Sequence, residues 1–536
     1  MDGEFDFIIV GAGTAGCVLA NRLTADPACR VLVVEDGPPD WFPTIHIPAA
    51  VGRAMVDPDL SWLYQIDPDA SRGGRADVFP CGRTLGGGSS INGLFFSRGQ
   101  REDFDDWAAL GNAGWGFKDV LPYFKRFETS EIGSDADRGR DGPLAVSRLR
   151  SVHPLSHVFL DAAAVCGIPR IDDYNGSKQA GASLVQVTQK NGRRHSASRA
   201  YLWPALVRRN LKLMPWTRVT RLIFEDRVCR GIEYRRGGVV RRAVARRETI
   251  LAAGAMASPK LLMLSGIGPL AHLADLGIPV VSDAPTVGAN LQEHPDMAVT
   301  ADVNLKTYNI AAGEPLTIAS YLARWMLFGD GPATSPFCQA VAFFSTTGDA
   351  GARPDLEILF APFSFLRGPK GSAPDPQPAV NAIVSLCRPS SRGRVSLRSK
   401  DPMDTIRVQL DLLDDRDWPK ILAGCRMARH ILAAEPFKPY VLAERAPGAA
   451  IERDDEWRDY VRNVSFPGNH LVGTCRMAPG ADGVVNPDLK VKGIERLRVI
   501  DASIMPTLIS AHTNAVALMI AEKGADLLVG AHATGR

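Results

Sequence analysis

The sequence predicts an α/β fold (α+β overall), with a Rossmann-type dinucleotide-binding domain and an inserted second domain built on an antiparallel sheet. An apolar strand at residues 5–10 is followed by the turn G-x-G-x-x-G at 11–16 and an apolar helix at 17–23. At 536 residues, the chain is too long for one ordinary domain. Residues 299–463 also differ in texture, because short strand-like runs alternate there with Pro/Gly loops.

The glycine turn has the spacing of a dinucleotide site. Gly11 turns the chain, Gly13 lets the backbone approach a pyrophosphate, and Gly16 lets the helix pack on the strand. A second strand at 30–34 leads to Glu35, about 20 residues on, where a carboxylate accepts hydrogen bonds from a ribose. That carboxylate would repel a 2′-phosphate, which disfavours NADP. The alternative is a purely structural strand-to-helix turn.

A second glycine-rich stretch spans residues 82–93 and follows a loop-rich segment at 37–77. Its glycines and small hydroxyls allow close backbone approach to a large ligand, and Asn92 offers both a donor and an acceptor. A flexible linker is the alternative interpretation. Arg83 and the apolar residues 94–96 bound the stretch, which favours an ordered loop.

Later segments complete the predicted architecture. Residues 248–251 form a strand, after which Ser258 is expected to cap a helix that has Pro259 in its first turn and ends at Gly266. Gly237 and Gly238 predict the turn of a surface hairpin with solvated arginines. A buried strand at 497–502 and a closing helix at about 513–528 return the chain to the first domain.

Composition narrows the class of protein. Hydrophobic residues make up 45% and charged residues 23%, as in globular proteins, and a net charge of +3 gives no reason to expect nucleic acid or a membrane surface as partner. The sequence has no apolar run of membrane-spanning length and no leader pattern, so we expect a cytoplasmic protein. The nine cysteines are scattered singly, and with no His/Cys cluster at ligand spacing we expect no metal.

Taken together, the motifs resemble those of the glucose-methanol-choline (GMC) family of flavin oxidoreductases over nearly the whole chain. The segments that carry the resemblance are the N-terminal fingerprint with Glu35, residues 82–99, residues 258–269, residues 287–295, residues 470–477 and residues 501–506.

The resemblance implies a discontinuous FAD-binding domain from residues 1–155, 200–298 and 464–536, and a substrate-binding domain from 156–199 and 299–463. Some relatives attach FAD through a histidine at the place of Ile91, which has no nucleophile, so noncovalent FAD is expected. The cofactor-binding residues that we expect are Gly11, Gly13, Thr14, Ala15, Gly16, Glu35, Arg83, Gly88, Ser90, Asn92, Gly93, Leu94, Val219, Asp501, Ala502, Thr513 and Asn514.

Two histidines carry the implied chemistry, the oxidation of an alcohol to an aldehyde or ketone. His470 opens the H-x-x-G-T motif and matches the family's catalytic base, since a neutral imidazole accepts a hydroxyl proton while hydride leaves the adjacent carbon. His512 matches the second catalytic position, which precedes a helix whose positive end favours flavin reduction. His294 lies in a family motif but is expected to be structural.

Two departures from the family pattern are visible. Asp36 stands where alanine is usual, next to the adenosine-binding acid, and Asn469 makes polar a wall that is often aromatic.

Alternatives remain at this stage. A plain NAD-dependent dehydrogenase would leave residues 82–93 and the His470 motif without a role. A hydroxynitrile lyase or a light-driven decarboxylase would keep the flavin fold without net alcohol oxidation. The electron acceptor is quinone-like or O2, with a preference for a quinone or dye, while the particular alcohol, the role of residues 335–339 and the oligomeric state stay open.

Overall fold

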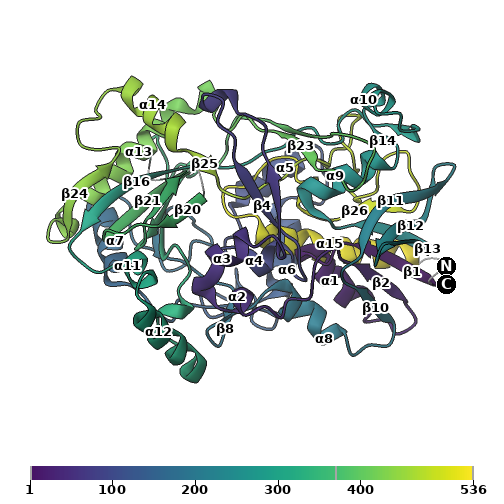
Figure 1. The fold of residues 1–536 in the computed structure, drawn as a ribbon, viewed down its shortest axis with the longest axis horizontal. Helices are drawn as coiled ribbons and strands as arrows, with labels where there is room; N and C mark the ends of the chain where they lie inside the picture. The colour runs from purple at the N-terminus through teal and green to yellow at the C-terminus, as the bar shows by residue number, and fades with distance from the viewer. Residues whose placement is uncertain (1–2, 350, 369–370, 534–536) are drawn as a thin grey trace.

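Two seven-stranded sheets organise the chain, and each draws its strands from distant parts of the sequence (Figure 1). The computed structural model describes residues 3–349, 351–368 and 371–533. The two ends of the chain lie close together beside the first sheet. Within the described residues, no helix has the length and apolar character needed to cross a bilayer.

The first sheet has the strand order β10-β2-β1-β13-β12-β11, with β26 also paired to β13. Strands β10, β2, β1, β13 and β26 pair in parallel, whereas β11, β12 and the first half of β13 form an antiparallel meander. The turn at Gly237 and Gly238 joins β12 to β13, as predicted. The strands are β1 Glu4–Val10, β2 Val31–Val34, β10 Leu211–Met214, β11 Arg218–Glu225, β12 Val228–Arg236, β13 Val239–Leu251 and β26 Leu497–Val499.

Helices from both ends of the chain pack on this sheet. Helix α1 (Thr14–Leu23) begins three residues before the predicted Cys17, directly after Gly13, and packs against the closing helix α15 (Asn514–Ala533). Helix α6 (Phe117–Phe127) packs on α15 in turn. The first hydrophobic core therefore joins residues that are about as far apart in the sequence as the chain allows.

The second sheet is antiparallel and has the order β24-β16-β21-β18-β17-β7, with β25 paired to β16. Our proposed domain limits cut through it twice, because β16 begins before residue 299 and β25 follows residue 463. The strands are β7 Gly181–Leu184, β16 Pro295–Val303, β17 Ala340–Phe344, β18 Leu356–Ala361, β21 Ala379–Leu386, β24 Val441–Ala446 and β25 Phe466–Pro467.

Period-two alternation explains how this sheet is covered. In β17, Ala340 and Ala342 face a core that α7 (Pro154–Val165) and α13 (Trp418–Ala433) also build, whereas Val341 and Phe343 face the opposite side. Leu359 of β18 and Ile383 of β21 share that opposite side, where they line a large cavity. Both faces of the sheet are thus buried, one by helices and the other toward the cavity.

The remaining α-helices are 3 to 14 residues long. They are α2 Pro43–His46, α3 Val51–Val56, α4 Gly88–Ile91, α5 Arg101–Ala109, α8 Trp203–Ala205, α9 Gly254–Leu264, α10 Leu270–Asp275, α11 Tyr308–Ala312, α12 Pro315–Phe328 and α14 Asp454–Val464. The two-stranded sheets are β3 Ser61–Gln65 with β4 Val78–Gly82, β5 Glu128–Ser130 with β6 Leu144–Val146, β8 Gln189–Lys190 with β9 Arg193–Arg194, β14 Ile267–Gly268 with β15 Ser282–Asp283, β19 Phe365–Gly368 with β20 Gly371–Pro374, and β22 Arg394–Leu397 with β23 Ile406–Gln409.

Two local predictions need correction. Residues 37–77, expected to be mostly loop, contain α2, α3 and β3. Ser258 does not cap α9, which begins four residues earlier at Gly254, because the Ser258 hydroxyl accepts from Ala253 N and donates to the Asp501 carboxylate instead. Pro259 consequently lies inside α9 and leaves the carbonyl of Ala255 without its helical donor. Thr474 Oγ1 donates to that carbonyl at 2.6 Å.

Candidate active site

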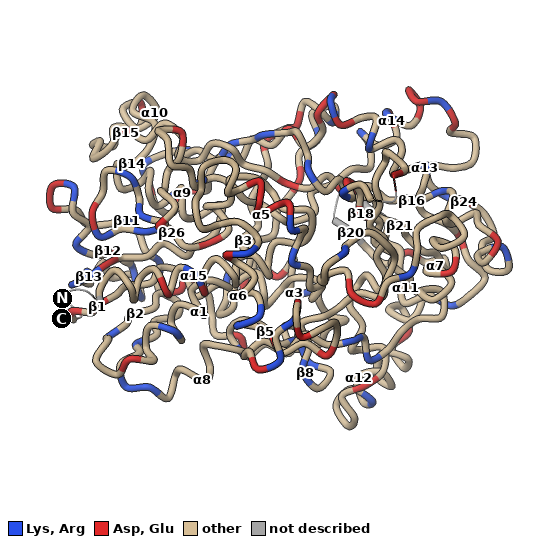
Figure 2. The backbone as a smooth tube through the Cα atoms, turned by 180° about the vertical axis from the view of Figure 1, so that it is seen from behind, with Lys and Arg blue, Asp and Glu red and all other residues tan. Residues whose placement is uncertain are grey.

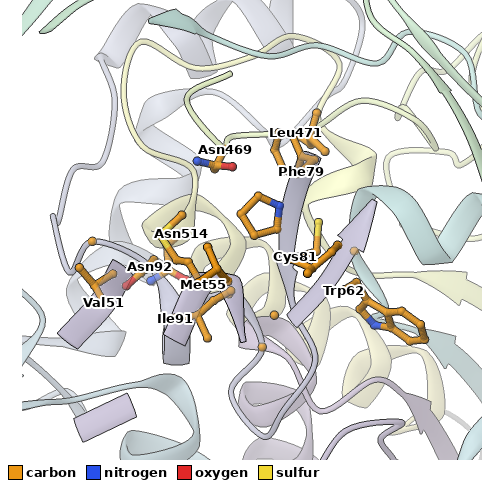
Figure 3. A pocket seen from close by; sticks show the side chains of 18 of the residues that line it. Val51, Met55, Trp62, Phe79, Cys81, Ile91, Asn92, Asn469, Leu471 and Asn514 are labelled. Atoms are coloured by element: carbon orange, nitrogen blue, oxygen red, sulfur yellow. The ribbon is translucent and has the colours of Figure 1, made fainter. Parts of the chain in front are cut away.

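A cavity of about 1810 Å³ opens between the carboxyl ends of the parallel strands and the second sheet. Val10 at the end of β1, Val34 at the end of β2 and Ala252 after β13 line one side. Ligands of open α/β sheets bind at this edge. Figure 3 shows Asn469 and Leu471 on the wall opposite Ile91 and Asn92. The volume exceeds the ~300–1,000 Å³ of ordinary ligand pockets, so it has room for a dinucleotide and a second small molecule.

Most residues predicted from the sequence line this cavity. They are Gly11, Gly13, Thr14, Ala15, Glu35, Gly88, Asn92, Gly93, Val219, His470, Asp501, Ala502, His512, Thr513 and Asn514. Four others lie outside its lining, namely Gly16, Arg83, Ser90 and Leu94.

The four residues outside the lining pack against the segments that form the cavity wall or make hydrogen bonds with them. A Cβ on Gly16 would lie 1.9 Å from Gly11 O, so glycine is needed for α1 to pack there. Ser90 Oγ donates to Leu85 O at 2.6 Å, and Leu94 is fully buried beneath the second sheet. Arg83 Nε binds Asp36 Oδ2 at 2.6 Å.

The two glycine-rich turns touch each other at one point. A Cβ on Gly87 would lie 2.7 Å from Gly13 Cα, and Gly86 N donates to Ala12 O at 2.7 Å. Gly87 also has φ +51°, in the left-handed region that favours glycine. Side chains here would separate the turns and fill the space between the α1 N-terminus and the cavity, so this cradle fits a pyrophosphate.

Glu35 is buried at the end of β2 with both oxygens engaged by the backbone. Ala12 N donates to Oε2 and Gly37 N to Oε1, each at 2.9 Å. Burial raises the pKa of Glu35 to about 7, although these two hydrogen bonds oppose the rise. The carboxylate also lines the cavity, where its remaining lone pairs suit ribose hydroxyls.

Asp36, the unusual neighbour of Glu35, links two arginines. It accepts from Arg83 Nε at 2.6 Å and from Arg218 Nε at 2.8 Å, and both guanidinium groups stack on the ring of Trp62. Burial opposes its charge, but the two arginines hold the pKa of Asp36 below its usual value. The departure from alanine thus builds a charged cluster at the Glu35 end of the cavity.

Asn92 is fixed by a residue that we did not predict. Its Oδ1 accepts from Leu94 N at 3.1 Å and from Arg194 Nη1 at 2.6 Å. Arg194 is buried and also binds the carbonyls of Ile45, Ser89 and Asn92, and burial lowers its pKa to about 9. With Oδ1 engaged, the amide NH2 of Asn92 is the group left to face the cavity. No local pattern along the chain points to Arg194, because its contacts cross about a hundred residues.

Three histidines form a continuous hydrogen-bonded chain. His470 Nε2 lies 3.0 Å from His512 Nδ1, and His470 Nδ1 lies 3.0 Å from His294 Nδ1. His294 Nε2 lies 3.2 Å from Cys387 O and 3.1 Å from Ile509 O. His294, which we expected to be structural, thus contacts the ring of His470 directly.

The hydrogen-bond partners of the three histidines show which ring nitrogens carry a hydrogen. Carbonyl oxygens only accept, so His294 Nε2 carries hydrogen and its Nδ1, in the neutral ring, is an acceptor. His470 must then donate from Nδ1, which leaves a lone pair on its Nε2. Burial lowers the pKa of His294 to about 3, and burial together with the other two histidines lowers that of His470 well below its usual value. Both rings are therefore neutral near pH 7.

His512 is the last of the three hydrogen-bonded histidines and lines the cavity. Its Nδ1–H points at His470 Nε2, and its Nε2 lies 3.4 Å from the Glu357 carboxylate. The ring of Phe95 packs against it with centroids 4.1 Å apart. His512 also lies two residues before α15, whose N-terminus, at Asn514, lines the cavity.

Glu293 holds the backbones of two of the three histidines in place. Its buried carboxylate accepts from His294 N and His470 N at 2.8 Å, and burial raises its pKa well above the usual value. Glu293, His294 and His470 lie close enough to suggest a metal site. The hydrogen bonds given above already engage the ring nitrogens of His294 and His470, and both oxygens of Glu293, without an ion.

The comparisons with known proteins agree over nearly the whole chain. Models of the GMC oxidoreductase family match residues 5–296 and 389–521. The oxygen-dependent choline dehydrogenase of Brucella ovis is 38% identical over 98% of this chain and 96% of that protein. The mitochondrial choline dehydrogenase of Homo sapiens is also 38% identical, over 98% and 90%.

Solved structures give the same result. Pyridoxine 4-oxidase from Mesorbium loti superposes with a TM-score of 0.88 at 29% identity, covering 97% of this chain and 98% of that one. A formate oxidase variant from Aspergillus oryzae, studied for its FAD modification, reaches 0.92 at 27% identity and covers 99% of both chains. The chain therefore belongs to the GMC oxidoreductase family of FAD-dependent enzymes that oxidise CH–OH groups.

Proposed function

We propose that this protein oxidises a primary or otherwise activated alcohol, with His470 as the base. The observation that carries the proposal is the convergence of His470 Nε2 and His512 Nδ1 in the cavity, 3.0 Å apart. A substrate hydroxyl that replaced this contact would donate to the lone pair of His470 Nε2 and accept from the Nδ1–H of His512. When bound, FAD supplies the hydride acceptor.

The proton path uses residues of this chain alone. His470 Nε2 takes the hydroxyl proton, and the positive charge that then develops on the ring is shared with His294 through Nδ1–H. His512 stabilises the negative charge that develops on the substrate oxygen. Glu293 holds His294 and His470 by their backbones, so the ring geometry does not depend on the substrate.

Different residues of the cavity wall suit the different chemical groups of FAD. The turns at Gly13 and Gly87 suit the pyrophosphate, Glu35 the ribose, Val219 the adenine through its backbone, and the Asn92 amide the flavin. Ile91 lines the cavity and has no nucleophilic atom, so we propose noncovalent attachment. Acid precipitation of the yellow protein should release intact FAD, whereas flavin retained on the denatured chain would refute noncovalent binding.

We infer that the alcohol carries a positive charge. Asp296 brings a buried carboxylate to the cavity wall, and aromatic rings such as Phe337 and Phe466 line the same region. Carboxylates and aromatic faces both attract organic cations. Choline, the substrate named for the two dehydrogenase relatives, is therefore the first alcohol to test, beside pyridoxine and uncharged aliphatic and aryl alcohols.

We propose a quinone or dye-like electron acceptor rather than O2, and a cytoplasmic location. Stoichiometric hydrogen peroxide, formed at the rate of alcohol loss, would overturn the proposed acceptor. A lower rate of peroxide release than of dye reduction would support it.

One anaerobic experiment tests the reaction class. Flavin absorbance should bleach when the correct alcohol is added in the absence of oxygen. Turnover of a cyanohydrin without bleaching would favour a lyase, and strict dependence on blue light would favour a decarboxylase. A colourless protein that binds NAD would refute the flavin assignment.

A further inference from the structure

Helix α12 (Pro315–Phe328) exposes four large apolar side chains, three of which are consecutive at its C-terminal end. Leu316 is 87% exposed, Leu327 74%, Phe328 73% and Met326 66%. Figures 1 and 2 both show α12 projecting from the outer edge of the molecule. Adjacent exposed side chains of this size at residues 326–328 are typical of an interaction surface.

The other side of α12 belongs to the cavity. Ile318, Tyr321 and Leu322 line it, so the helix forms a wall between the cavity and the outside. Helix α3 has the same double character, because Met55 lines the cavity while Val56 is 65% exposed. The segments next to these helices, Pro48–Ala50 and Pro332–Thr334, contact each other, and residues of both line the cavity.

Exposed cations lie beside these apolar side chains. The helix itself contains no acidic residue, and its Arg324 is paired with Asp330. Trp325 Nε1 donates to Gly192 O at 2.8 Å and the guanidinium of Arg193 stacks on its ring, which fixes the basic hairpin β8–β9 against the helix. Arg150 reaches the carbonyl of Gly329 at the helix C-terminus. The two acids that flank α12, Glu314 and Asp330, are paired with Lys306 and Arg324.

We infer that α12 docks this protein on the surface of an anionic phospholipid bilayer. Leu316, Met326, Leu327 and Phe328 would enter the boundary between headgroups and acyl chains, while Arg150, Lys190 and Arg193, all exposed, reach lipid phosphates. A second copy of the same surface is disfavoured as the occupant, because it would bring the same cations face to face. The low net charge of the whole chain conceals this local patch.

Docking through α12 would place the cavity wall that this helix forms next to the membrane surface. An acceptor or substrate dissolved in the bilayer would then meet the cavity beside α12 without crossing water. The docking itself does not depend on the proposed reaction, since it follows from the exposed side chains and charges alone.

Vesicle sedimentation of the FAD-loaded protein tests the inference. We expect binding to vesicles of equal parts phosphatidylglycerol and phosphatidylcholine, much weaker binding to phosphatidylcholine alone, and partial release by salt. The double substitution Leu316→Glu/Leu327→Glu should weaken binding at least about tenfold, because two exposed leucines lose their apolar burial. Val207→Glu, at a position 86% exposed and outside the patch, is the matched control and should bind normally.

Unchanged FAD content and melting temperature would show that both variants are folded. Equal sedimentation of the double variant and the control would overturn the inference, as would a lack of binding to anionic vesicles. A dimer of the wild type that becomes monomeric in the double variant, without vesicle binding, would identify the surface as a contact between copies and would equally overturn it.

Discussion

His294 Nδ1 and His470 Nδ1 lie 3.0 Å apart, and only His470 has a hydrogen to place between them. This contact fixes the orientation of the His470 ring and puts its lone pair on Nε2, the atom that faces His512. We therefore expect His294 to act through His470 as a positioning residue.

We expect His294→Ala to slow flavin reduction by on the order of tenfold or more, because the His470 ring is then free to turn and to exchange tautomers. His294→Gln should restore part of the rate, since its amide oxygen can accept from His470 Nδ1–H. The pH dependence of flavin reduction is the second readout, and the apparent pKa of the base should shift in His294→Ala. Equal rates and pH profiles for the wild type and both variants would exclude the positioning role.

His512 should matter through its hydrogen bond to the substrate oxygen. His512→Asn keeps a donor and should retain much more activity than His512→Ala, whose loss we expect at about 10²-fold, the usual weight of one donor to a developing oxyanion. Both should bind FAD normally. The rate of anaerobic flavin reduction at saturating alcohol measures the effect, and equal rates for the two variants would argue against the role.

FAD affinity should fall as the pH falls through about 7, the raised pKa of Glu35. Ribose hydroxyls donate to the ionised carboxylate, so FAD binds the charged form of Glu35 more tightly than the neutral form. Above this pKa the carboxylate is already ionised, and the affinity for FAD does not change with pH. Below it, each pH unit costs up to about tenfold in affinity. Glu35→Gln should bind FAD weakly and with little pH dependence. Fluorescence titration of apoprotein with FAD measures both, and a wild-type affinity independent of pH would contradict the assignment.

Thr474→Val should destabilise the fold by about 1–3 kcal/mol, because Ala255 O would be left buried without a donor inside α9. Thr474→Ser keeps the hydroxyl and serves as the matched control. Chemical denaturation of the FAD-loaded proteins gives the difference, and equal stability of Val and Ser variants would show that the Ala255 carbonyl finds another partner.

Local signals in the sequence predicted the framework of the fold. The glycine spacing at 11–16 and the buried strands around it are properties of neighbouring residues, and β1, β2 and α1 follow them closely. Ser258 shows the limit of that reasoning. Its sequence context resembles a helix cap, yet its hydroxyl binds Asp501, 243 residues away, and the helix begins earlier.

The site shows the same limit. His470 and His512 were predicted because each lies in a recognisable motif. The contact of His294 with His470 spans 176 residues, and Arg194 reaches Asn92 across 102, so neither pairing is visible along the chain. The Asp36 cluster likewise depends on Arg218, which the first sheet brings to the end of β2.

The base assignment of His470 is tested most directly by anaerobic stopped-flow reduction of His470→Ala, with the exposed His430→Ala as control. We expect flavin reduction by the alcohol to slow by about 10²- to 10⁴-fold in His470→Ala, with FAD content unchanged, and to stay at the wild-type rate in His430→Ala. Flavin reduction near the wild-type rate in His470→Ala, at full FAD content, would contradict the assignment and remove His470 from the mechanism.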